Sequence, residues 1–65
     1  MKLAYRSKDH AKVASFIFYA DEYEGMKFTL SRSGDTWSAI ATEAYDEQVT
    51  RALVRNFKQD AEGFF

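Results

Sequence analysis

Four large apolar residues follow one another in a chain of only 65 residues: Phe16, Ile17, Phe18 and Tyr19. Neighbouring side chains of a β-strand point to opposite faces, so this run would make both faces of one strand apolar. A chain of this length can cover one face of a sheet with a helix, but little of it remains to cover the other. The run therefore indicates that a second molecule covers part of the surface.

A β-hairpin is predicted over residues 26–42. Residues 26–32 alternate between apolar and polar, which is typical of a strand with one buried face. The turn residues Ser33, Gly34 and Asp35 follow, and residues 36–42 continue with strand-forming side chains. A two-residue loop at 33–34 or at 34–35 places the same six residues on the core side: Met26, Phe28, Leu30, Trp37, Ala39 and Ala41. The other side carries Lys27, Thr29, Ser31, Ser38, Ile40 and Thr42.

Residues 12–20 are interpreted as a further strand, because the segment is rich in aromatic and branched residues. If residues 21–25 form the loop before the hairpin, then Ala14, Phe16 and Phe18 face the core. Val13, Ile17 and Tyr19 then share the open face with Ile40. A loop shorter by one residue would exchange the two sets.

Two further readings concern this part of the chain. Residues 2–6 also alternate, and they could pair beside residues 12–20 after a polar turn. The alternative to a strand at 12–20 is a helix over residues 8–24, with Ser7 as its N-cap and Gly25 as its C-terminal stop.

A C-terminal helix begins after Asp46, which is a plausible N-cap, and Glu47 suits the positive end of the helix dipole. Apolar residues then recur at helical spacing, and this stripe is expected to pack on the sheet. The stripe consists of Val49, Ala52, Leu53, Phe57, Ala61 and Phe64. Gly63 is expected to make Phe64 and Phe65 a separately placed tail.

The sequence thus predicts a single compact domain over residues 1–65 with an α+β fold. We expect an antiparallel sheet of three to four strands with one C-terminal helix packed on one face. The alternative is an α-β-β-α order in which residues 8–24 are helical.

Composition excludes several classes of protein. The chain has no cysteine, which excludes disulfides and cysteine-ligated zinc. Nine basic and ten acidic residues give a net charge of −1, which argues against non-specific nucleic-acid binding and equally against mimicry of DNA. The longest uncharged run, residues 13–20, is too short to span a membrane. We expect a cytoplasmic protein that does not bind membranes.

No arrangement of residues indicates catalysis. His10 is the only histidine, and without a cysteine or an exposed-serine motif it has no nucleophile to activate. Asp21, Glu22 and Glu24 cluster in one segment but lack the regular spacing of a calcium loop. We therefore expect no enzyme activity, no metal and no cofactor.

Two sets of residues are candidates for contact with a partner. The first is the open-face set Val13, Ile17, Tyr19 and Ile40, since apolar side chains that converge on one sheet face form a candidate interface core. The second is a sector of the C-terminal helix that contains Arg51, Arg55 and Lys58, with Val54 at its margin. Arginine is enriched both at protein interfaces and in phosphate contacts.

These observations favour a small non-enzymatic regulator or inhibitor that binds a protein, of the kind that phages and other mobile elements often encode. A homodimer is also possible on this sequence. The alternatives are a nucleic-acid-binding module, which is less favoured, and a small structural subunit of a larger complex.

Overall fold

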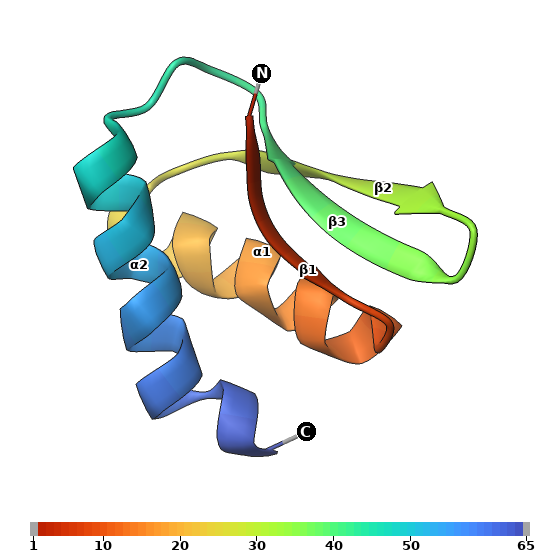
Figure 1. Cartoon of the computed structure of the whole chain (residues 1–65). Coiled ribbons are helices and arrows are strands. Elements are labelled where there is room, and N and C mark those ends of the chain that lie inside the picture. The colour runs from red at the N-terminus through yellow and green to blue at the C-terminus, as the bar shows by residue number, and fades with distance from the viewer. Residues whose placement is uncertain (1, 65) are drawn as a thin grey trace.

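The computed structural model describes residues 2–64, and it has an α+β fold with two helices and one open sheet (Figure 1). The elements follow in the order β1 (Leu3–Ser7), α1 (His10–Glu24), β2 (Phe28–Ser33), β3 (Thr36–Ala41), α2 (Glu47–Asp60) and a short 3₁₀ helix η1 (Glu62–Phe64). The sheet is antiparallel with the strand order β1-β3-β2. Helix α1 lies against one face of the sheet, while α2 packs against α1 and β1. The predicted α+β class, with an antiparallel sheet and a C-terminal helix, is confirmed.

The predicted hairpin is confirmed, including which residues face the core. β2 and β3 pair with Phe28 opposite Ala41 and Leu30 opposite Ala39, and Ser33 lies opposite Thr36. The loop is therefore Gly34-Asp35. Gly34 has a φ of 63°, a conformation that glycine adopts without steric cost at the first position of a type II′ turn.

The strand predicted over residues 12–20 is wrong, and the alternative helical interpretation of this segment is correct. The N-cap of α1 is Asp9 rather than Ser7, and the Asp9 carboxylate accepts a hydrogen bond from the Ala11 N–H at 3.0 Å. At the other end, Gly25 has a φ of 64° and its N–H donates to the Asp21 carbonyl at 3.1 Å. This is an αL-type C-cap, which satisfies a carbonyl that the helix end leaves free.

Helical spacing also overturns the predicted facing of this segment. Val13, Phe16 and Ala20 are fully buried at positions i, i+3 and i+7, which is the stripe that a helix presents to a sheet. Phe18, which the strand interpretation placed in the core, is 72% exposed. Local β-propensity of the aromatic run was outweighed by the caps and by the burial that the helical stripe makes possible.

β1 pairs with β3, and not with residues 12–20 as the sequence suggested. Tyr5 lies opposite Ala39 and Ser7 opposite Trp37, while a β-bulge interrupts the register between Leu3 and Tyr5. α1 follows β1 in the chain, and β1 pairs with β3 and not with β2. β1 therefore lies on the far side of the hairpin from β2 and forms one edge of the sheet.

Helix α2 begins after Asp46 as predicted and buries Leu53 and Phe57, but Val49, which belonged to the predicted stripe, is 48% exposed. Phe57 meets the core aromatic Phe16, whose ring centroid lies 5.4 Å from that of Phe57 and 5.0 Å from that of Tyr5. The helix therefore completes the core at its junction with α1 and β1. Phe65 and the side chain of Phe64, which were expected to form a separate tail, lie outside the described residues. No helix within residues 2–64 is both long enough and apolar enough to cross a membrane.

Candidate protein-binding groove

A cavity of about 580 Å³ lies between the N-terminal end of β1, the β3–α2 connection and the first half of α2. A second cavity, of about 340 Å³, is lined by all five residues of β1 together with residues of α1, α2 and η1. Both cavities are bordered by Leu3, Ala4 and Val54, so they adjoin one another along β1. We call the two together the β1–α2 groove. The three residues that border both cavities are apolar, and they form the floor of the groove.

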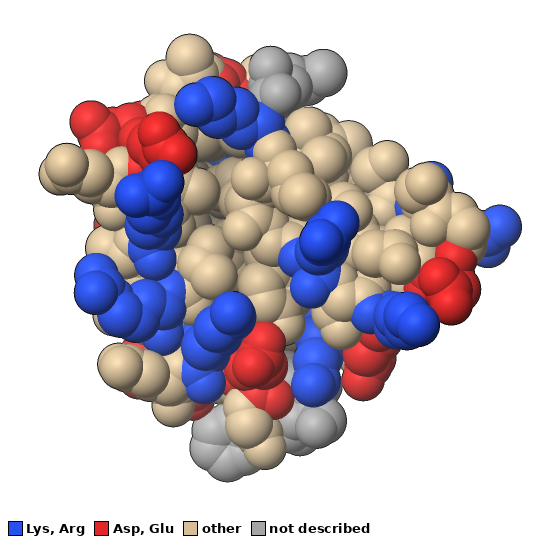
Figure 2. Space-filling model, in the orientation of Figure 1, with Lys and Arg blue, Asp and Glu red and all other residues tan. Residues whose placement is uncertain are grey.

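The border of the groove concentrates positive charge. Five of the nine basic residues of the chain line it, against three of the ten acidic residues. The basic residues are Lys2, Arg6, Lys12, Arg51 and Lys58, and the acidic ones are Glu43, Glu47 and Glu62. Figure 2 shows this face of the molecule, where Lys and Arg side chains surround a central uncharged area. The groove therefore has a net positive border in a protein of net charge −1.

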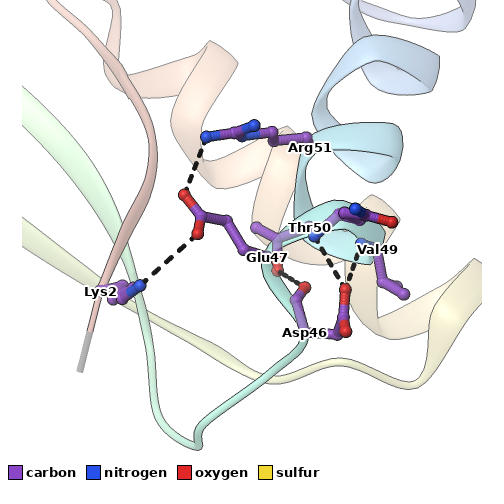
Figure 3. Close-up of polar contacts among 7 residues, drawn as sticks. Lys2, Asp46, Glu47, Val49, Thr50 and Arg51 are labelled. Carbon is purple, nitrogen blue, oxygen red and sulfur yellow. Dashed lines mark hydrogen bonds and ion pairs between the residues drawn. The ribbon is translucent and has the colours of Figure 1, made fainter.

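Two of the three carboxylates that line the groove form hydrogen bonds or ion pairs with other side chains of the protein. Glu47 accepts a hydrogen bond from the Arg51 guanidinium at 2.9 Å and lies 3.9 Å from the Lys2 ammonium (Figure 3). Glu62 accepts a hydrogen bond from the hydroxyl of Tyr5. Burial, together with this bond, raises the pKa of the Tyr5 hydroxyl above its usual range, so Tyr5 remains a donor to Glu62 well into the alkaline range.

Three groove cations have no such neighbour. Arg6, Lys12 and Lys58 form no ion pair with any residue that the structure describes. A cation without a protein partner can meet an anionic ligand without first losing an existing contact. These three side chains are therefore the strongest attachment points for negative charge in the groove.

The walls of the groove are held in place by specific polar contacts. The Asp46 carboxylate accepts hydrogen bonds from the Gln48 and Val49 N–H groups at 2.8 and 3.2 Å, and so fixes the start of α2. The Tyr45 hydroxyl accepts a hydrogen bond from the Lys27 N–H at 2.7 Å, while its ring packs 5.8 Å from that of Phe28. The β3–α2 connection is thus tied to the hairpin, and the wall it forms is preorganised.

The predicted open-face set does not form one surface. Val13 is fully buried, and Ile17 is half-buried against the core on α1. Tyr19 joins α1 to α2 through a hydrogen bond of its hydroxyl to Asp60 at 3.0 Å. Ile40 lies on the opposite face of the sheet from Ala39, away from the helices. The set was inferred from a strand that is in fact a helix.

Most of the predicted helix sector does lie at one site. Arg51, Val54 and Lys58 all line the groove, whereas Arg55 is exposed beside it. Sequence reasoning missed the contribution of Lys2, Leu3, Ala4, Arg6 and Lys12. The alternating apolar and basic residues at the N-terminus were visible, but nothing local indicated that β1 would lie beside α2.

Other polar residues of interest lie in structural contacts. The ring of His10 packs edge-on against that of Trp37 at 4.5 Å. Asp21, which belongs to the acidic cluster, forms an ion pair with Lys27. Within residues 2–64, no three histidine or carboxylate side chains gather in a way that could hold a metal ion.

Comparison of the chain with protein-family models, with curated proteins and with solved structures found no match. The function of the groove has to be inferred from its own chemistry.

Proposed function

We propose that the protein is a small, non-enzymatic, cytoplasmic regulator or inhibitor that binds a partner protein in the β1–α2 groove. The observation that supports this is the combination of an apolar floor with a border of cations, three of which lack ion pairs among the described residues. Apolar contact supplies affinity, while complementary charge selects the partner and speeds encounter. The ligand with matching chemistry is an acidic segment that also carries apolar side chains.

A protein ligand fits the groove better than a nucleic acid does. Three carboxylates, Glu43, Glu47 and Glu62, line the groove among the cations. They would repel a phosphate backbone, which carries a charge on every unit, whereas a peptide can place its carboxylates opposite the cations only. Single-stranded nucleic acids also bind through exposed aromatic rings on which bases stack. Among the side chains that the structure describes, the aromatic ones that line the groove are Tyr5, which is buried, and Tyr45, which is half-buried. Both rings pack against core aromatics.

The proposal can be tested without knowing the partner, by selecting binders from a random dodecapeptide library displayed on phage. We expect selected peptides to be rich in Asp and Glu interleaved with apolar residues. Their affinity, measured by fluorescence polarisation of a labelled synthetic copy, should fall with added salt.

Two charge reversals on α2 form a matched pair for the same assay. Lys58 lines the groove and Arg55 lies outside it, and neither forms an ion pair with the described residues. Lys58→Glu should weaken peptide binding by about tenfold, and Arg55→Glu by less than about twofold. Circular dichroism serves as the control that both variants fold.

Four results would contradict the proposal. Selection could yield no acidic peptides, or Arg55→Glu could weaken binding as much as Lys58→Glu. A twelve-nucleotide oligothymidylate that binds more tightly than any selected peptide, and loses affinity with Lys58→Glu, would favour the nucleic-acid-binding module instead. If light scattering shows a dimer that Lys58→Glu dissociates, the occupant of the groove is a second copy of this chain.

A further inference from the structure

The floor of the groove includes the unpaired edge of the sheet. Among residues 2–64, β1 is hydrogen-bonded to β3 on one side and pairs with no other strand, so it is an edge strand. All five of its residues, Leu3–Ser7, line the second cavity, and Val54, Lys58 and Glu62 face them across it. The free edge of β1 therefore lies inside a groove whose other wall is the second half of α2 and the start of η1.

The register of β1 and β3 shows which backbone groups of β1 are free. The Ala41 N–H donates to the Lys2 carbonyl at 2.9 Å, so position 2 bonds to β3 and position 3 points its backbone groups the other way. Ala39 and Trp37 present their backbone groups to the same side of β3 as Ala41, because hydrogen-bonding direction alternates along a strand. Their partners are Tyr5 and Ser7.

Arg6, which lies between Tyr5 and Ser7, therefore directs its N–H and C=O into the groove. Leu3 does the same, and the bulge leaves Ala4 without a partner of its own on β3. An exposed strand edge of this kind is a template for a further strand. The backbone donors and acceptors of Leu3 and Arg6, which point away from β3, are consequently available to a ligand.

The side chains around this edge match an extended ligand with two different faces. A strand placed beside β1 would turn alternate side chains toward α2, where they meet Val54 and Lys58. The intervening side chains would lie on the outer face of the sheet beside Leu3 and Arg6, which lie opposite Ile40 and Ser38 of β3. Each face thus offers one apolar contact and one cation without an ion pair among the described residues.

We propose that the acidic ligand segment binds to the free edge of β1 as a fourth strand, with backbone hydrogen bonds to Leu3 and Arg6. This inference rests on the proposed function and specifies the mode of binding. Main-chain hydrogen bonds supply affinity in this mode, and the alternating side chains supply selectivity.

A proline at position 6 tests the backbone contact directly. Proline removes the N–H that points into the groove and leaves the bonds of Tyr5 and Ser7 to β3 intact, a placement that edge strands tolerate. Since Arg6→Pro also removes a charge, the control is Arg6→Gln, which removes the charge and keeps the N–H. For a selected peptide, Arg6→Gln should weaken binding a few-fold, and Arg6→Pro should weaken it about five- to tenfold further.

N-methylated peptides give an independent measurement that needs no change in the protein. In one series alternate amides of the selected peptide are methylated, and in the other series the intervening amides are methylated. Only the amides that face β1 form hydrogen bonds with it, so one series should lose binding and the other should retain it. This result decides the matter if Arg6→Pro does not fold.

The outcomes separate this inference from the proposed function. If Arg6→Pro binds like Arg6→Gln and both methylated series bind like the parent peptide, then the ligand does not form a strand on β1, although the groove still binds it. If Lys58→Glu leaves the binding of the same peptide unchanged, the groove is not the binding site and the proposed function itself is wrong.

Discussion

Two phenylalanines on α1 provide a sharp test of the fold, because they differ in burial and not in chemistry. Phe16 is fully buried, with ring centroids of Tyr5, Phe28 and Phe57 at 5.0, 5.4 and 5.4 Å, while Phe18 is 72% exposed. Replacing a buried phenylalanine by alanine costs about 3–5 kcal/mol, and each aromatic pair adds about 0.5–1.5 kcal/mol beyond area burial. Phe16→Ala should therefore lie at the upper end of that range.

The total stability of a 65-residue domain is about 3–10 kcal/mol, so Phe16→Ala removes a large part of it. Phe18→Ala should change the free energy of unfolding by less than about 0.5 kcal/mol, because the side chain is mostly in water and alanine favours the helix. Urea unfolding followed by circular dichroism at 222 nm measures both values. If Phe16→Ala is unfolded without urea, Phe16→Leu gives a smaller loss on the same scale. Equal losses at positions 16 and 18 would refute the helical assignment of this segment and restore the strand.

Three further predictions concern stability. Leu53→Ala and Phe57→Ala should each cost about 2–5 kcal/mol, because both side chains are buried where α2 meets the core, and thermal melts that match the parent would contradict this packing. The pKa of Tyr5 is raised by burial and by its bond to Glu62, so its contribution to stability is present below the unfolded-state pKa of about 10 and is lost as the pH rises above it. Urea midpoints between pH 7 and 12 should therefore fall less steeply in Tyr5→Phe than in the parent, and parallel curves would contradict the assignment. Gly25→Ala should cost about 1–2 kcal/mol in a urea titration, because Gly25 has a φ of 64°, and an unchanged midpoint would mean that the C-cap is relaxed in solution.

How far the sequence predicts this fold depends on the range of the interactions involved. The hairpin was predictable because strict alternation and the Gly34-Asp35 turn act over a few residues, and α2 was predictable from the Asp46 cap and its apolar period. For α1 the local signals conflict. The aromatic run favours a strand, whereas Asp9 and Gly25 mark helix ends and Val13, Phe16 and Ala20 recur at helical spacing. Burial of that stripe against the sheet decided between them, and burial depends on partners that the segment itself does not contain.

The groove was less predictable than the fold, because it exists only where distant parts of the chain meet. Lys58 was among the residues that the helix sector suggested, and it does line the groove. Arg6 and Lys12 were not suggested, since their role depends on β1 crossing to the far side of the hairpin and lying beside α2. The pairing of residues 3–7 with residues 37–40 produces no periodic pattern in the sequence between them, so no local signal predicts it.

The distribution of charge over the fold changes what the net charge of the protein implies. A net charge of −1, averaged over the chain, argues against anionic ligands. That argument assumes that positive and negative side chains are evenly distributed over the surface. The distribution is uneven, because five of the nine basic residues border one groove while seven of the ten acidic residues lie outside it. An acidic segment that approaches from the groove side meets an attractive field, and the same segment on the other sides meets a repulsive one. The asymmetry orients the encounter as well as favouring it, so its effect should be greater on the association rate than on the dissociation rate, and it should fade once the Debye length drops well below about 10 Å.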